Sequence, residues 1–253
     1  MPFTVAHVVA ARPLWRAVGG RLPLSAVAVG SVAPDLEYLW HLDTERTIGH
    51  DLWGAVVLDM PLALALLALW HGLFKRALAA LVSRRFRPAI DTGPFPFGPL
   101  RRFGVVVLGV LVGVAGHLVW DGFTHRDGFI TTRVWFLREA IGRPHVYDLF
   151  NYASTVFGLG VLGWWWWRSA GHGVRTADSE GAANRLPAGV RLRALAILLS
   201  VAAAGGIANG VRLRLDGWGM ETTLIGAILG GMSAGLIGLT AVSLALRSRL
   251  TGG

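Results

Sequence analysis

Long apolar segments recur along this chain of 253 residues, separated by loops that contain arginine. A helix needs roughly 20 apolar residues to cross the hydrocarbon core of a bilayer, because it rises 1.5 Å per residue. Inside lipid, each helix pairs its own backbone N–H and C=O groups. The sequence therefore predicts an all-α, polytopic integral membrane helical bundle with about five spans, over residues 52–74, 103–123, 151–167, 191–211 and 222–246.

The residues before the first span predict two shorter helices, which are interfacial or re-entrant. Residues 4–18 form an amphipathic pattern, and residues 22–33 are apolar but too short to span before Pro34. The chain then divides into an N-terminal segment with ligand candidates, a three-span core, a hydrophilic linker and two C-terminal spans, at 1–51, 52–168, 169–190 and 191–253.

Composition restricts the chemistry that this chain offers. Charged residues make up only 15%, against about a quarter in soluble domains. The chain has no cysteine, so any metal must bind to nitrogen and oxygen ligands. The net charge of +9 comes from arginines that flank apolar runs, which indicates contact with lipid and a topology signal rather than nucleic acid. Membrane lipid is the partner that we expect.

The distribution of basic residues predicts an orientation. With five spans, the loops 75–102 and 168–193 and the tail after 246 lie on one side and hold fourteen of the 24 Lys and Arg residues. Basic loops stay in the cytoplasm, so we expect a multi-pass protein of the bacterial cytoplasmic membrane. The start of the first span and the end of the second then meet water near the outer face.

The second span ends in a histidine–aspartate pattern. His117, Asp121 and His125 are four residues apart, so in a helix their side chains share one face. Ionisable groups within a span are costly and usually face a protein interior or a wet cavity. Two imidazoles that flank a carboxylate predict part of a metal site, although a polar network that joins helices has the same pattern.

The first span brings further candidates to the same membrane edge. Consecutive spans run antiparallel, so His50 and Asp51 at the start of one lie beside Asp121 at the end of the next. Asp59 is eight residues inside Asp51, or roughly 12 Å deeper, at a level similar to that of His117. Asp59 is then either an acceptor that orients His117 or itself a metal ligand.

The N-terminal segment adds His7 on the first helix, and Asp35 and Glu37 after a run of small residues. Because Pro34 ends that run, we expect Asp35 to project from the tip of the helix. The predicted ligands of a divalent metal, most simply zinc, are His7, Asp35, His50, His117, Asp121 and His125. The predicted general bases are Asp51 and Glu37. Asp59 is predicted to lie next to the ligands and to orient one of them.

The ordered motifs MPFTVAH, GSVAPDLEYLW, GHDLWG followed by DMP, and GHLVWDGFTH resemble a family of uncharacterised bacterial integral membrane proteins, grouped as a domain of unknown function. The resemblance covers about residues 1–160. More distantly, the pattern is similar to bacterial membrane-bound metal-dependent hydrolases. Zinc-dependent phospholipases C share the H-x3-D element. This resemblance implies metal-binding roles for His7, Asp35, His50, His117 and Asp121.

These features lead to three functional hypotheses. The first is a membrane-embedded metal-dependent hydrolase that acts on a lipid-linked phosphoester. The second is a transporter or ion-handling protein that uses Asp59, His117 and Asp121 as a path, although no inverted repeat is visible in the sequence. The third is a structural membrane protein in which the polar residues only hold helices together.

Overall fold

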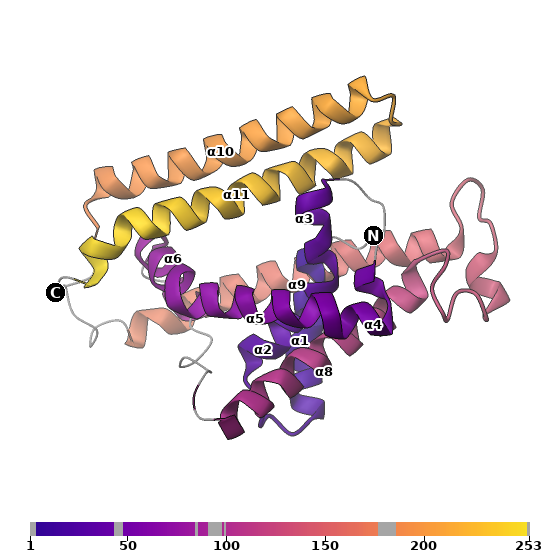
Figure 1. The fold of residues 1–253 in the computed structure, drawn as a ribbon, viewed down its shortest axis with the longest axis horizontal. Helices are drawn as coiled ribbons and strands as arrows, with labels where there is room; N and C mark the ends of the chain where they lie inside the picture. The colour runs from indigo at the N-terminus through magenta and orange to yellow at the C-terminus, as the bar shows by residue number, and fades with distance from the viewer. Residues whose placement is uncertain are drawn as a thin grey trace. The chain divides into compact units, whose positions relative to one another are not determined.

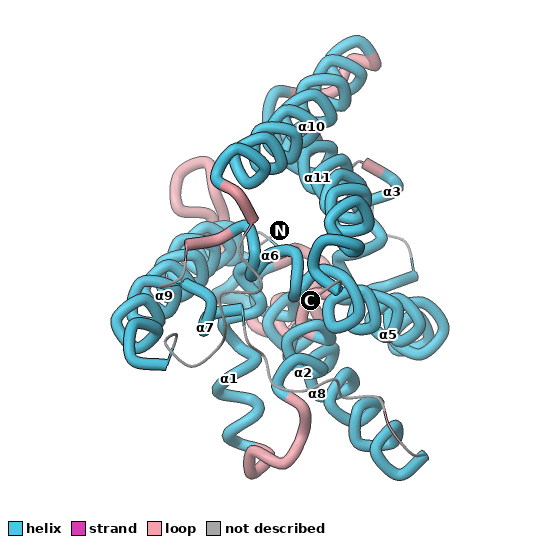
Figure 2. Tube along the Cα trace, turned by 90° about the vertical axis from the view of Figure 1, so that its left-hand side faces the viewer, coloured by secondary structure: helices cyan, strands magenta, loops and turns pink. Residues whose placement is uncertain are grey.

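The structure is a computed structural model that describes residues 4–42, 48–83, 86–90, 98, 100–176 and 186–251. In this part of the chain the secondary structure is helical, apart from one isolated β-bridge between Ala140 and His145 (Figure 2). The predicted all-α membrane fold is confirmed. The contacts divide the chain into two compact units: unit 1 is Met1–Asp35, Ile48–Leu67 and Thr92–Trp167, and unit 2 is Leu36–Thr47, Ala68–Asp91 and Arg168–Gly253.

Within the described residues, four helices are long and apolar enough to cross a membrane: Ala55–Leu81, Arg102–Thr124, Ala188–Leu215 and Met220–Arg247. They correspond to four of the five predicted spans. The remaining segment, 151–167, lies within the long helix α9 (Val146–Thr176), which is not among the four. Its tryptophans and polar residues lower the mean hydropathy, so its crossing of the membrane stays a prediction.

Unit 1 contains the two N-terminal helices that the sequence predicts, the first part of the first span, the second span and most of α9. Its elements in chain order are η1 (Thr4–His7), α1 (Val8–Ala17), α2 (Leu24–Gly30), η2 (Ala33–Glu37, whose last two residues belong to unit 2), η3 (Ile48–His50), α4 (Leu52–Gly54), η4 (Ala55–Asp59), α5 (Met60–Leu69, which continues into unit 2), α8 (Leu100–Thr124), η7 (Trp135–Arg138) and α9.

Glycines let α2 and α8 lie against each other at backbone distance. A Cβ atom at Gly30 would collide with the carbonyl of Val110, and one at Gly113 would collide with the carbonyl of Val27. This close approach is the small-residue packing expected between helices in lipid. It brings the C-terminal end of α2 onto the middle of α8, directly before the histidine–aspartate pattern.

One stripe of α8 is buried from its middle to its end. Val106, Val110, Val114, His117 and Asp121 are each less than 5% exposed and have the helical spacing of three or four residues. The apolar half of this stripe lies along α2, and the polar half continues on the same face. The packing of α2 therefore also fixes the direction in which the polar residues point.

The first span is not a regular α-helix throughout. It begins with a π-helical segment, η4, over Ala55–Asp59, and contains a second, η5, over Trp70–Phe74. A π-helix is wider than an α-helix and carries one additional residue in the turn; such segments are frequent at functional sites. Asp59, the last residue of η4, is fully buried.

Unit 2 is built on a hairpin of two long helices that run side by side, α10 and α11 (Figure 1). Its other described elements are short, and its apolar core joins Leu81 and Ala194 to Val242 and Leu246. The elements are α3 (Tyr38–His41), η5, α6 (Lys75–Leu81), α7 (Arg87–Ile90), α10 (Ala188–Leu215) and α11 (Met220–Thr251). The predicted linker 169–190 lies partly outside the described residues.

The hairpin binds the end of α3 through polar side chains. The buried Asn209 amide donates hydrogen bonds of 2.7 Å to the carbonyls of Leu42 and Gly226. The Ser233 hydroxyl donates to the carbonyl of Leu39. The carbonyls of Leu39 and Leu42 lie at the end of α3, where a helix leaves its last carbonyl groups without a partner within the helix.

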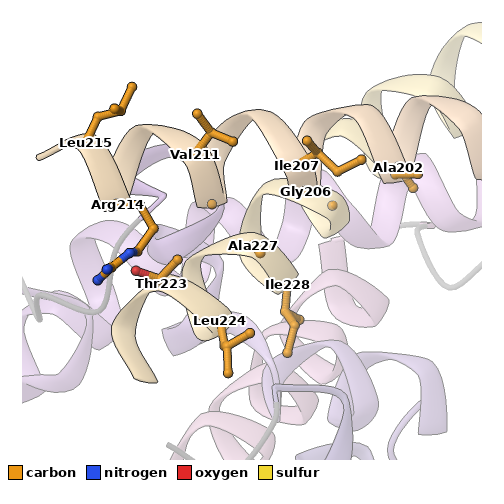
Figure 3. Close-up of a pocket in the computed structure, with 13 residues that line it drawn as sticks. Ala202, Gly206, Ile207, Val211, Arg214, Leu215, Thr223, Leu224, Ala227 and Ile228 are labelled. Atoms are coloured by element: carbon orange, nitrogen blue, oxygen red, sulfur yellow. The ribbon is translucent and has the colours of Figure 1, made fainter. Parts of the chain in front are cut away.

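A shallow groove runs along the α10–α11 seam, with a volume of about 880 Å³. In Figure 3 the side chains of Ile207, Val211 and Leu215 stand on the outer side of α10, and Arg214 and Thr223 lie together at one end. The Arg214 guanidinium donates to the carbonyl of Trp218, so it closes the turn of the hairpin. The groove is otherwise apolar and results from the small residues that bring the two helices together.

Candidate metal centre

Four of the predicted ligands converge within unit 1. Asp35, His50, His117 and Asp121 each offer one ligand atom, and these atoms all lie within 4.8 Å of one another. They come from three places in the chain: the η2 turn after α2, the η3 turn before the first span, and the end of α8. The cluster could hold a metal ion.

The separations fit ligands of one ion better than a network of hydrogen bonds. The Nε2 atoms of His50 and His117 lie 3.5 and 3.6 Å from Asp35 Oδ1, and 3.6 and 3.5 Å from Asp121 Oδ2. Hydrogen bonds between nitrogen and oxygen are shorter, at about 2.9 Å. Nitrogen and oxygen atoms at about 2.1 Å from a tetrahedral ion would lie roughly 3.4 Å apart.

A backbone carbonyl fixes the orientation of His117. Its Nδ1 lies 2.9 Å from the carbonyl oxygen of Ser31, the residue directly after α2. A carbonyl only accepts, so Nδ1–H is the donor, and in the neutral ring Nε2 presents its lone pair to the two carboxylates. Metal-binding histidines typically have such a second partner, which sets the tautomer and the ring orientation.

The burial of these groups requires a compensating positive charge. Asp35 and Asp121 are 1% and 4% exposed. Within the described residues, neither oxygen of Asp35, nor the Nε2 atoms of His7 and His117, has a hydrogen-bond partner. Burial would raise the pKa of the Asp35 carboxyl, but His117, then His50 and His7, hold it below its ordinary value. Two buried carboxylates beside these imidazoles carry a negative charge that protonated histidines or one divalent cation would balance.

His7 lies beside these four residues rather than among them. Its ring stacks on that of His117 with centroids 4.0 Å apart, and its Nε2 lies 3.5 Å from Asp121 Oδ1. Burial, and then the neighbouring His117, lower the pKa of His7 to about 4. The ring is therefore neutral at pH 7, the form that binds metal, and its role as a ligand stays a prediction.

His125 lies just past the end of α8 and is occupied locally. Its Nδ1 is 3.4 Å from Asp121 Oδ2, and 3.2 Å from both the Asp121 carbonyl and the Thr124 hydroxyl. The structure therefore brings His125 to the edge of the cluster. Because α8 ends at Thr124, His125 does not continue the helical face that His117 and Asp121 share. Its role as a ligand also stays a prediction.

The three remaining candidates are placed differently. Asp51 is exposed, one residue after His50, and Glu37 is buried in unit 2, so their roles as bases stay predictions. The sequence also offered Asp59 as the acceptor that orients His117. The Ser31 carbonyl takes that place at Nδ1, and a direct ligand role for Asp59 stays a prediction.

Polar residues after α8 hold the end of the site in place. Thr131 donates to the carbonyl of Gly122 through its backbone and its hydroxyl, and Asn151 of α9 donates to the carbonyl of Thr124. These bonds satisfy carbonyls that a helix terminus leaves open. Thr131 and Asn151 were not predicted from the sequence; the position of Thr131 six residues after His125 was the one available signal, and Asn151 is too distant in the sequence to be linked to the motif.

Comparison with known proteins places the chain in a family. The sequence matches the family described as a domain of unknown function (DUF4184) over residues 1–244. The chain belongs to this family. The predicted resemblance to such a family is thus confirmed, and the match extends through the C-terminal hairpin. No curated protein matches the chain. No solved structure matches it either.

Proposed function

We propose that this member of the DUF4184 family is a membrane-embedded metal-dependent hydrolase with its centre at Asp35, His50, His117 and Asp121. The observation that carries the proposal is the His117 ring, which is held by the Ser31 carbonyl so that its Nε2 faces two buried carboxylates at 3.5 and 3.6 Å. A structural network would join these groups by hydrogen bonds of ordinary length.

Zinc is the metal that suits this set best. The ligands are two imidazoles and two carboxylates, and the four separations between imidazole nitrogen and carboxylate oxygen, at 3.5 to 3.6 Å, are those expected around a tetrahedral ion. When bound, such an ion would supply Lewis acidity and make hydroxide available near neutral pH. The chain's own residues would fix the ligand geometry, and the exposed Asp51, beside His50, is the accessible carboxylate for general base catalysis.

The proposed substrate is a phosphoester linked to a lipid. The cluster lies before one helix and in the last turns of another that are apolar enough to span a membrane, which supports a position near the level at which headgroups meet water. In the hydrolysis, the oxygen of water bonds to phosphorus, the phosphorus–oxygen bond to the alcohol breaks, and the alcohol leaves with a proton. The basic loops favour the bacterial cytoplasmic membrane with the site on its outer face.

Metal analysis tests the site first. The protein is purified in detergent without chelator, and bound metal is measured by inductively coupled plasma mass spectrometry. We expect about one zinc ion per chain in the parent and background levels in His117→Ala and Asp121→Asn. His145→Ala is the matched control, because its side chain is 43% exposed and lies outside the cluster. A metal-free parent, or full metal in both variants, would contradict the proposal.

Turnover tests the reaction separately. Zinc-loaded protein is incubated with vesicles of phosphatidylglycerol and phosphatidylethanolamine, and the released phosphate-containing and lipid products are identified by mass spectrometry. We expect products with the parent and with His145→Ala but not with Asp121→Asn. Bound metal without any lipid product would support the metal site but contradict the proposed hydrolase activity.

A further inference from the structure

A large cavity lies in unit 1 between α1, α8 and α9, with a volume of about 1060 Å³. This size is at the upper end for small-molecule sites, which usually occupy about 300 to 1,000 Å³. Its lining is apolar apart from the hydroxyls of Thr124 and Ser154. The side chains of Phe123, Phe150, Phe157 and Trp164 are each more than 40% exposed, so the cavity is open along one side.

One end of this cavity adjoins the metal centre. Trp120 lines the cavity, and its ring meets that of His7 edge-on with centroids 6.2 Å apart. Thr124 also lines it, and its hydroxyl lies 3.2 Å from Nδ1 of His125. A molecule that fills the cavity would therefore end one side-chain layer from the cluster.

The length of the cavity matches one leaflet of a bilayer. Its lining along α8 runs from Val112 to Thr124, which is about 18 Å at 1.5 Å per residue. The hydrocarbon core is about 30 Å thick, so the chains of one leaflet fill about 15 Å. An apolar space of this length, open along one side of a membrane protein, fits a single extended hydrocarbon chain.

We propose that this cavity binds one acyl chain of a membrane phospholipid, with the headgroup beside the metal centre and the chain end near Trp164 and Trp165. The inference rests on the proposed function only for the reaction at the headgroup; occupancy of the cavity is independent of it. Because bulk lipid is as apolar as the lining, shape and contact rather than the hydrophobic effect would select the chain.

The end of the cavity near Trp165 would allow the lipid to bind in the opposite orientation, and the experiment must distinguish the two orientations. The exposed Arg12 guanidinium lies 5.9 Å from the Trp165 ring centroid, so a positively charged side chain lies at this end of the cavity. If an anionic headgroup bound to Arg12, the end of the acyl chain would instead lie near the metal centre. Probes at two positions in one phospholipid decide between these orientations.

Photo-crosslinking tests the proposal in vesicles of phosphatidylethanolamine and phosphatidylglycerol. A phosphatidylglycerol with a diazirine in mid-chain should label residues of the cavity wall, identified by peptide mass spectrometry. A diazirine in the headgroup should label the Trp120–Thr124 end. Ala115→Trp on α8 and Ser154→Trp on α9 fill the cavity from opposite walls and should each lower mid-chain labelling about tenfold.

Ala153→Trp is the matched control, because Ala153 is exposed on α9 and does not line the cavity. Size-exclusion chromatography checks that each variant folds. Labelling spread evenly over the lipid-facing helices, or lowered equally in the control, would overturn the proposal, and headgroup labelling at Trp165 would overturn its orientation. Asp121→Asn should keep the labelling, so a failure of the metal centre stays distinct from a failure of the lipid site.

Discussion

Both units bring helices together through small residues, but a central cluster of buried polar groups in unit 1 differs from the polar contacts of unit 2 in the distances at which the groups meet. In unit 2, Asn209 hydrogen-bonds to backbone carbonyls at 2.7 Å. In unit 1, His117 faces Asp35 and Asp121 at 3.5 to 3.6 Å. The first arrangement is complete within the chain, as expected of polar side chains that join helices. The second is too open for hydrogen bonds and has the spacing of ligands.

Burial of polar residues in a membrane protein therefore does not by itself identify a site. The informative quantity is the distance at which the buried groups meet. A hydrogen-bonded pair at about 2.7 to 2.9 Å needs nothing further, whereas acids and imidazoles at about 3.5 Å are stable together only with an added proton or cation. By this measure the candidate site belongs to unit 1, and we interpret the described polar contacts of unit 2 as structural.

Metal should stabilise the two units unequally, and this is the largest effect that we expect. Zinc at 100 times its Kd adds about 2.7 kcal/mol to the state that binds it, which would slow local amide exchange roughly 100-fold. Hydrogen exchange measured by mass spectrometry should show this slowing in peptides over 30–35 and 122–131, but not in α10 and α11. Equal slowing in both units, or slowing that persists in His117→Ala, would contradict the comparison.

Displacing α2 should weaken the metal centre without touching a ligand. In Gly113→Ala the new methyl group would push against Val27 and shift the Ser31 carbonyl that orients His117. Loss of such a supporting contact typically lowers metal affinity about 10- to 100-fold. Competition with a fluorescent zinc chelator measures the change.

The matched control for this substitution is Gly104→Ala in the same helix, where an added Cβ meets nothing within 4 Å. We expect its zinc affinity to equal that of the parent. Equal affinities in all three proteins would show that the contact between α2 and α8 does not support the site.

The smallest effect should come from the polar contacts of unit 2. Asn209→Ala removes hydrogen bonds to Leu42 and Gly226, and such bonds between membrane helices contribute about 0.6 to 1.7 kcal/mol. Thermal unfolding in detergent should show this loss, while bound metal stays unchanged. Ile207→Ala, on a side chain that is 68% exposed, serves as the control. A loss of bound metal in Asn209→Ala would contradict the assignment of the metal site to unit 1 and of a purely structural role to Asn209.

Helical spacing and the antiparallel order of spans made much of the site predictable from the sequence. The four-residue interval placed His117 and Asp121 on one face of α8, and the antiparallel order of the first two spans brought His50 to the same edge. Asp35 was inferred from the proline that ends the preceding small-residue run. These inferences use only helix geometry and chain direction, which lipid constrains strongly.

The supporting contacts were not predictable in the same way. The partners of His117 Nδ1 and of Asn209 are backbone carbonyls, and every residue has a carbonyl. Only the packing of α2 on α8 decides which one lies close enough to His117. The long helix α9 shows a second difficulty, which concerns the recognition of spans. Its row of four tryptophans offers large apolar rings to lipid, but tryptophan lowers the mean hydropathy by which a span is recognised.

The π-helical turn Ala55–Asp59 holds one residue more than a regular α-helix would need between the same flanking segments. A chain one residue shorter here could therefore continue as a regular α-helix with little rotation of the residues before the turn relative to those after it. In the regular helical segment that follows, Met60–Leu69, the loss of one residue would instead rotate the two sides by about 100°. The first span should thus tolerate a shortened chain at the π turn better than in the α-helix beside it.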